Sequence, residues 1–159
     1  MPVPAEVIDR VLERMAPLVE ESSVSFGMPV LIVAPGAILE VVRVLRDELE
    51  LDLFVDVTAV DWPGQQPRFE VVYHLYSTKH FARVRVKTRV PEQDPTLDSL
   101  ISLYGAAAYM ERECHDMYGI AFRGNADLRP ILLYEGFEGH PLRKDYPKDR
   151  EQPLVPYRT

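Results

Sequence analysis

The chain has 159 residues, 47% of them hydrophobic and 27% charged, a composition typical of one globular domain with a buried core. Its formal net charge of −7 would repel free nucleic acid and anionic membrane surfaces on average. The single cysteine, Cys114, excludes an internal disulfide, and no apolar run approaches the roughly 20 residues needed to span a bilayer. We therefore expect a soluble, cytosolic chain that does not insert directly into a membrane.

The first third of the chain predicts a helix, two strands and a second helix. Apolar residues recur at helical spacing from Pro4 to Glu20, which predicts an amphipathic helix. A short segment around Val24 and Phe26 and the β-branched run Pro29–Ala34 predict a hairpin. Pro35 suits the first turn of a second helix. The apolar stripe of that helix consists of Ile38, Val41, Val42, Leu45 and Leu49.

Three strands are predicted next, at Leu53–Val60, Phe69–Tyr76 and Phe81–Val90. Helical spacing returns with Leu97, Leu100, Ile101 and Tyr104, so we expect a helix capped by Thr96 or Asp98 that is interrupted near Gly105 and ends at Gly119. The order helix, two strands, helix, three strands, helix predicts an α+β two-layer sandwich in which helices cover one face of a mixed sheet. Residues 1–120 would form the core domain. Residues 121–159 would be an extended C-terminal docking segment without a fold of its own.

The reactive side chains do not form a recognisable catalytic or metal-binding set. The four histidines, which lie on different predicted elements, are His74, His80, His115 and His140. Cys114 and His115 are neighbours on a helix and point about 100° apart, so they do not form a nucleophile and its base. Glu111, Glu113 and Asp116 are best explained as a solvated or salt-bridged helix face. We expect no catalytic, cofactor-binding or metal-binding residues.

A row of cations on the strand Phe81–Val90 is the best indication of nucleic-acid binding. Arg83, Arg85, Lys87 and Arg89 alternate with apolar residues, and Tyr73 and Tyr76 on the neighbouring strand could stack bases, as in an RNA-binding sheet. The negative net charge favours a solvated outer face, or one paired with acidic residues of a partner. An RNA-binding domain and a small hydrolase that uses Cys114 or Glu111 remain as alternatives.

Three sequence runs resemble one family. The run EREcHDMYGI at Glu111–Ile120, then GNADLRPIL, and GFEGHPLRKDYP at Gly136–Pro147 resemble the 30-kDa-type subunit of respiratory complex I, the proton-pumping NADH:quinone oxidoreductase. Upstream, RFEVVYHL and the basic strand are also similar. The chain departs from the family in two places, with Asn125-Ala126 where His-Pro is common, and His115 where an aromatic residue is common.

The resemblance implies a structural subunit without FMN or iron–sulfur clusters, which other subunits of the complex hold. It implies a place in the hydrophilic arm, on the cytoplasmic side of the cell membrane. There the chain would pack on the 49-kDa-type subunit, which forms the quinone site with neighbouring hydrophilic subunits. An equivalent subunit of a related complex, a ferredoxin-type enzyme or a membrane-bound hydrogenase, fits the sequence as well, since no electron-donor site lies on this chain.

The C-terminal segment is the predicted attachment region, because arginine and aromatic residues are common anchors of protein interfaces. We expect Glu111, Arg112 and Glu113 to fix its start, by pairing with Arg143 or Lys144. We also expect Arg143→Ala to weaken assembly while the isolated domain stays folded. The full set of predicted docking and structural residues is Glu111, Arg112, Glu113, Asp116, Tyr118, Arg123, Arg129, Phe137, Glu138, His140, Arg143, Lys144, Asp145 and Tyr146.

Overall fold

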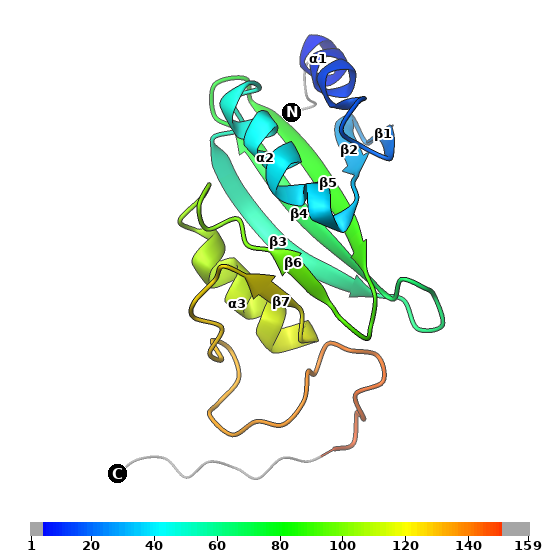
Figure 1. Cartoon of the computed structure of the whole chain (residues 1–159), viewed down its shortest axis with the longest axis vertical. Helices are drawn as coiled ribbons and strands as arrows, with labels where there is room; N and C mark the ends of the chain where they lie inside the picture. Colours follow the sequence, from blue (N-terminus) through cyan, green and yellow to red (C-terminus); the bar gives the residue numbers. More distant parts are fainter. Residues whose placement is uncertain (1–4, 151–159) are drawn as a thin grey trace.

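A five-stranded mixed sheet forms the centre of the computed structural model, which describes residues 5–150 (Figure 1). The strand order is β1-β2-β5-β4-β3, and β2 and β5 run parallel while the other neighbours are antiparallel. The five strands are β1 (Glu21–Ser25), β2 (Met28–Ile32), β3 (Leu53–Asp61), β4 (Phe69–Ser77) and β5 (Ala82–Val90). The predicted hairpin, formed by β1 and β2, is confirmed.

Within residues 5–150, three α-helices accompany the sheet. They are α1 (Ala5–Met15), α2 (Ile38–Asp47), which follows the 3-10 turn η1 (Pro35–Ala37), and α3 (Ala107–Tyr118). The first helix ends at Met15 rather than at the predicted Glu20. Pro17 explains the difference, because proline has no N–H to donate and disfavours helical backbone in the residue before it. In residues 5–150 no helix is long and apolar enough to cross a membrane.

The core lies between one face of the sheet and the helices (Figure 1). The predicted stripe of α2 is buried, and its residues Ile38, Val41, Val42 and Leu45 are fully shielded from solvent. On β4, Phe69, Val71, Tyr73 and Leu75 alternate toward the same core, as expected for a strand with one buried face. The predicted α+β two-layer sandwich with a mixed sheet is therefore confirmed.

The segment after β5 differs from the prediction. Residues 96–98 form a short strand, β6 (Thr96–Asp98), instead of the first half of a helix, and the last helix begins at Ala107. β6 pairs in parallel with β7 (Ala121–Arg123), which has no predicted counterpart. Leu97 and Phe122, opposite each other in this pair, are both buried. Their pairing across 25 positions is a non-local contact, which overrides the local helical spacing. The division at residue 120 stays a prediction, but β7 joins the first residues of the predicted docking segment to the core.

Candidate docking site

The C-terminal half of α3 and the chain that follows it form the candidate site. We call residues 124–150 the tail. It has no helix or strand, and Figure 1 shows it looping below α3 at one end of the molecule. Some of the predicted docking residues hold the tail to the core, and others face outward.

Glu111 holds the start of the tail from inside the core. Its side chain is fully buried and accepts hydrogen bonds from Ser99 Oγ at 2.6 Å, the Leu100 amide at 2.7 Å and Asn125 Nδ2 at 3.0 Å. Burial raises the pKa of Glu111, while these three donors act in the opposite direction. The expected pairing of Glu111 with Arg143 or Lys144 is therefore not what the structure shows.

One carboxylate oxygen of Asp116 orders the middle of the tail. Asp116 Oδ2 accepts hydrogen bonds from three successive backbone amides, those of Ile131, Leu132 and Leu133, at 3.1, 3.0 and 2.9 Å. Hydrogen bonds to an ionised acceptor are stronger than those between neutral groups. Asp116 thus takes the place of the backbone carbonyl oxygens that these amides would bind in a strand or a helix.

Arg112 holds the preceding stretch of the tail from the same helix. Its guanidinium donates to the carbonyl oxygens of Arg129 and Pro130, both at 3.0 Å, and lies 3.6 Å from Asp127. Asp127 is in turn paired with Arg129 through two hydrogen bonds of 2.8 Å. Arg112 thus binds backbone within its own chain.

His140 and Arg143 close over the C-terminal end of α3. The helix ends at Gly119, whose φ of +75° is left-handed backbone that suits glycine. His140 Nδ1 donates to the Asp116 carbonyl at 3.0 Å, and Arg143 Nε donates to the Tyr118 carbonyl at 2.6 Å. A Cβ atom on Gly119 would lie within 2.7 Å of both side chains, so the close approach requires glycine. Both tail residues therefore act as a C-terminal cap for α3.

Arg143 and Arg68 also contact the sheet through an aromatic ring. The guanidinium carbons of both arginines lie about 5 Å from the ring centroid of Phe69, at 5.0 and 5.1 Å. This distance is within the range of a cation–π interaction. Arg143 thus points inward and contacts the core of its own chain through the Tyr118 carbonyl and the Phe69 ring.

The last anchor is a buried ion pair that the sequence did not indicate. Arg68 binds Asp61 with two hydrogen bonds, and both side chains are almost fully buried. Arg68 also reaches Glu92 at 2.5 Å and Asp145 at 2.9 Å, and the Lys144 amide donates to Asp61 Oδ2 at 2.8 Å. The hydrogen bond from Arg68 lowers the pKa of Asp61 and of Asp145. The pair thus fixes the far end of the tail.

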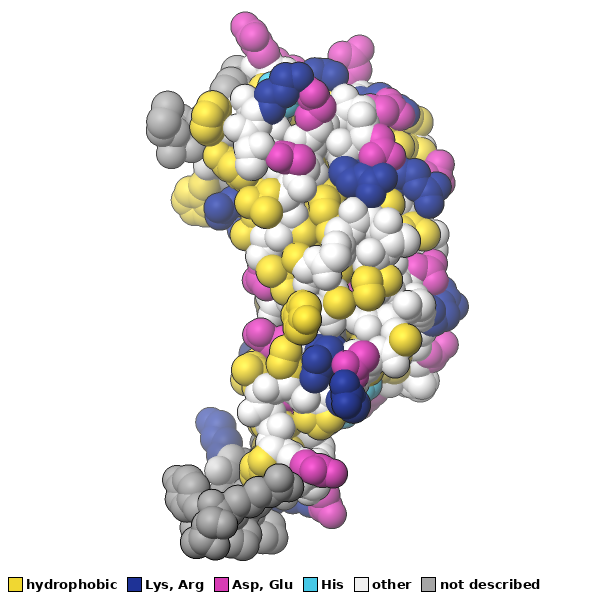
Figure 2. Space-filling model, turned by 90° about the vertical axis from the view of Figure 1, so that its left-hand side faces the viewer, with side chains coloured by type: hydrophobic (Ala, Val, Ile, Leu, Met, Phe, Trp, Pro, Cys, Tyr) yellow, Lys and Arg dark blue, Asp and Glu magenta, His cyan; other side chains and the backbone are white. Residues whose placement is uncertain are grey.

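With its backbone held by the core, the tail presents apolar side chains to solvent. Four of these side chains are exposed, with exposed fractions of 38% for Ile131, 62% for Leu132, 37% for Tyr134 and 50% for Leu142. Beside them a groove of about 600 Å³ runs between α3 and the tail, lined in part by Arg112, Pro130 and Leu133. Figure 2 shows hydrophobic side chains along this side of the molecule, from the sheet edge toward the tail. We call the four tail residues the apolar ridge.

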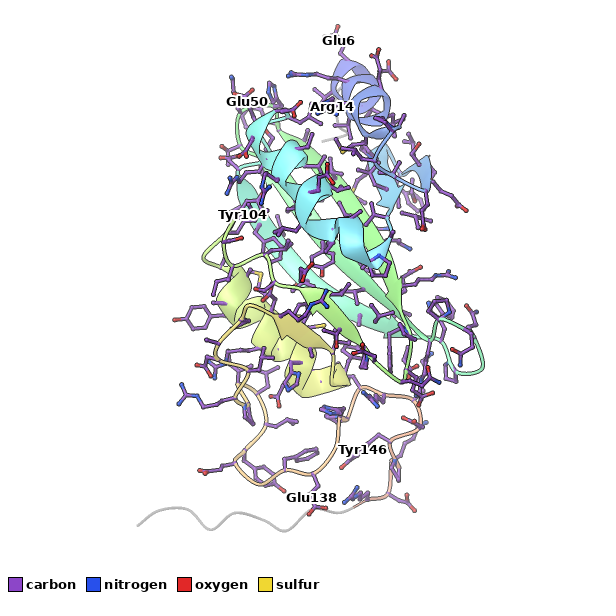
Figure 3. All side chains as sticks on the ribbon, in the orientation of Figure 1. Glu6, Arg14, Glu50, Tyr104, Glu138 and Tyr146 are labelled. Atoms are coloured by element: carbon purple, nitrogen blue, oxygen red, sulfur yellow. The ribbon has the colours of Figure 1, made fainter. Side chains whose placement is uncertain are left out.

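Three aromatic rings stiffen the lower part of the tail. Phe137 stacks on Tyr146 with ring centroids 6.0 Å apart, and Tyr134 contacts Phe137 edge-on at 5.5 Å. Glu138 binds Arg150 at 2.6 Å. Figure 3 shows Glu138 and Tyr146 at the end of the molecule opposite Glu6 and Arg14.

Three other residues in the predicted set, Glu113, Arg123 and Arg129, are exposed to solvent. Arg123 pairs with Asp98 across the β6–β7 ladder at 3.0 Å, and Arg129 is engaged by Asp127. Glu113 is exposed on α3. The predicted set therefore contains residues that hold the tail and residues that are open to a partner. Four further residues complete the anchoring of the tail. In the sequence, Ser99 and Asn125 are marked only by their polar side chains, and Asp61 and Arg68 only by their charge.

Two candidate catalytic residues, Cys114 and His115, are engaged by packing and by a backbone hydrogen bond. Cys114 is 2% exposed, and burial raises the pKa of its thiol well above the usual range. His115 Nδ1 donates to the Ile120 carbonyl at 2.9 Å, away from Cys114. Among residues 5–150, no group of three or more His, Cys, Asp or Glu side chains is arranged to hold a metal ion.

Taken together, the fold and the site define a class of protein, a small α+β domain that carries a long surface segment pre-ordered by its own core. The chain belongs to the family of the respiratory-chain NADH dehydrogenase 30 Kd subunit, whose family model matches residues 31–152. The match begins near the end of β2 and includes β3, β4 and β5, α3 and the whole of the anchored tail.

Similar proteins agree with this assignment. The chain is 44% identical over 141 residues to the C-type subunit of the NADH-quinone oxidoreductase of Methylobacterium sp. (strain 4-46), covering 87% of this chain and 65% of that protein. It is 50% identical over 117 residues to the subunit of the same name from Citrifermentans bemidjiense, covering 72% and 73%. A chain in the structure of an archaeal membrane-bound sulfane sulfur reductase matches with a TM-score of 0.78 at 30% identity, over 90% of this chain and 85% of that chain. The chain thus spans less than two thirds of the Methylobacterium relative.

Proposed function

We propose that this chain is a structural and assembly subunit of the peripheral arm of a proton-translocating NADH:quinone oxidoreductase. It would hold no FMN or iron–sulfur cluster and would have no catalytic residues. It would lie on the cytoplasmic side of the membrane and support the quinone-site subunit, of the 49-kDa type, together with neighbouring hydrophilic subunits. The family membership and the names of its relatives support the proposal that the chain is part of this complex. The anchored tail supports the proposed structural role.

One observation carries this proposal, the anchored tail with its outward apolar ridge. An irregular segment that becomes ordered only on binding loses conformational freedom at that moment, which weakens binding. Here Arg112, Asp116 and Arg143 hold the tail backbone before any partner arrives. The ridge residues then remain as rigid apolar anchors, the type of surface that forms the centre of protein interfaces.

The expected effect of Arg143→Ala changes accordingly. Arg143 would support assembly indirectly, because its guanidinium positions the tail on Tyr118 and Phe69. Its loss would raise the ordering cost of docking rather than delete a contact with the partner.

Affinity purification tests the proposal. The tagged chain is expressed in cells that make the complex, membranes are solubilised in mild detergent, and co-purifying subunits are identified by mass spectrometry. The 49-kDa-type subunit should be recovered with the wild type and lost with Leu132→Asp, which places a charge on the ridge. Phe81→Asp, a matched control at an exposed phenylalanine in the β4–β5 loop, should keep it. Recovery of the chain alone under gentle conditions would contradict the proposal.

A second candidate is the equivalent subunit of a related respiratory complex with another electron donor. The structural likeness to a chain of the archaeal sulfane sulfur reductase favours it, since that complex is not named for NADH. The same purification separates the two candidates. Recovery of flavin- and NAD-binding subunits supports an NADH enzyme, and their absence beside the other subunits supports the related complex.

A further inference from the structure

A row of four cations lies on the sheet face opposite the core. Arg83, Arg85, Lys87 and Arg89 alternate along β5 with buried residues such as Val84 and Val86. Because successive side chains of a strand point to opposite faces, all four point away from the helices, with a spacing of about 7 Å between neighbours. The central position of β5, between β2 and β4, makes this a rigid row.

The sheet itself supplies few acidic partners for this row. Glu70 of β4 binds Lys87 at 2.8 Å and Arg89 at 3.4 Å. Arg85 donates to the uncharged acceptor His74 Nε2 at 3.3 Å. Within residues 5–150, the Arg83 side chain has no hydrogen bond or ion pair, although its backbone pairs with β4. Asp56 on β3 is the next acid on this face, and it makes no ion pair in the described part of the chain.

Positive charge is thus concentrated on one sheet face of a chain whose net charge is −7. The stems of the row pack over apolar residues, since Val30 opposite Arg85 and Val72 opposite Lys87 are both nearly buried. The face therefore offers guanidinium groups that lie above apolar side chains. Arginine in such a setting binds carboxylates with paired hydrogen bonds.

We propose that this face docks an acidic segment of a partner protein, one that presents three or more carboxylates about 7 Å apart. The segment would neutralise Arg83, Arg85 and Arg89, the cations that Glu70 leaves least compensated. This interface is separate from the apolar ridge and depends on charge rather than apolar area, so it holds or fails independently of the function proposed above.

The surroundings favour a polypeptide over RNA. Recognition of single-stranded RNA on a sheet relies on several exposed aromatic rings that stack with bases. Tyr73 is fully buried on the opposite face, which leaves Tyr76 as the one tyrosine on β4 beside the cations, together with the ring of His74, which is engaged by Arg85. The expected stacking pair of Tyr73 and Tyr76 is therefore not present.

Binding of poly-L-glutamate to the purified full chain tests the proposal, measured by fluorescence anisotropy at low and high salt. The wild type should bind, and added salt should weaken binding. Arg83→Glu should weaken it by about tenfold, because one attraction becomes a repulsion. Arg83→Lys, which keeps the charge, should restore most of the affinity. Circular dichroism shows whether each variant is folded.

Arg43→Glu is the matched control, since it makes the same change of charge at an exposed position on α2, on the other side of the sheet. It should change the affinity by less than about twofold. Leu132→Asp on the ridge should also bind normally. Three results would overturn the proposal: no binding by the wild type, equal losses for Arg83→Glu and Arg43→Glu, or tighter binding of oligouridylate than of poly-L-glutamate.

Discussion

Arg68 binds the buried carboxylate of Asp61 through two parallel hydrogen bonds, Nε to Oδ1 at 2.7 Å and Nη2 to Oδ2 at 2.8 Å. The same guanidinium reaches Glu92 after β5 and Asp145 in the tail. One side chain thereby links three segments that are distant in sequence, the β3–β4 connection, the end of β5 and the tail. Its geometry is the paired arrangement that arginine makes best with carboxylates.

Removal of this arginine should destabilise the whole domain. Arg68→Ala leaves Asp61 charged, buried and without its main partner, and breaking a buried pair from one side costs about 3 kcal/mol. We expect a lower urea midpoint in an equilibrium unfolding experiment. The control is Arg14→Ala, which breaks an exposed pair with Glu48 and should leave the midpoint almost unchanged. Similar midpoints for the wild type and Arg68→Ala would contradict the assigned role.

Asp116→Ala should release the middle of the tail while α3 stays intact. The amides of Ile131, Leu132 and Leu133 lose their common acceptor and should exchange with solvent at least about tenfold faster, as measured by hydrogen–deuterium exchange. Glu113→Ala, a similar change at an exposed position of the same helix, should leave the three amides protected. Unchanged protection in Asp116→Ala would mean that other contacts hold this stretch.

Gly119→Ala should disturb the tail from the end of α3. A methyl group there forces a side chain into left-handed backbone and displaces the ends of His140 and Arg143, for a total of about 2 kcal/mol or more. Gly36→Ala is the control, because a Cβ atom at that site meets no neighbouring atom within 4 Å. We expect a lower melting temperature and faster exchange of tail amides for Gly119→Ala alone.

Acid should loosen the attachment of the tail near Asp145. Arg68 lowers the pKa of both Asp61 and Asp145, so the folded chain holds fewer protons on them than the unfolded chain does. Their stabilising effect is fully present above about pH 4, the unfolded value, and is lost as the pH falls through the lower folded-state pKa values. Urea unfolding across this acid range should show a smaller loss of stability for Asp145→Asn than for the wild type. Equal losses would argue against the linkage.

The sheet and α2 could be predicted because their patterns are local. Alternation along Phe69–Tyr76 and along the basic strand fixes which side chains are buried, and the stripe from Ile38 to Leu49 fixes the buried face of α2. The same logic failed at Thr96, where apolar residues at helical spacing belong to β6 and to an irregular turn. Three residues are too few to show a strand period, and the pairing strand follows only after α3.

The composition of the tail pointed to docking, but it could not show which side chains face inward. Arginine and aromatic residues are equally suited to holding a chain on its own core and to binding a partner. Arg143 faces inward because Gly119 opens space for it, and that relationship depends on the left-handed turn and not on residue type. The pairing of Asp61 with Arg68 could not be predicted, because the segment between β3 and β4 shows neither helical nor strand periodicity. Their partners in the tail lie up to 83 positions away in the sequence.

The parallel pairing of β6 with β7 determines where the chain can be divided without damage. α3 lies between the two strands in sequence, so a cut at Gly119 would leave Leu97 without Phe122 and Glu111 without Asn125. Homologous tails could be exchanged between relatives only from a point beyond Asn125. Transplantation of the segment from residue 126 onward should therefore give folded chimaeras, whereas an exchange from residue 120 should not.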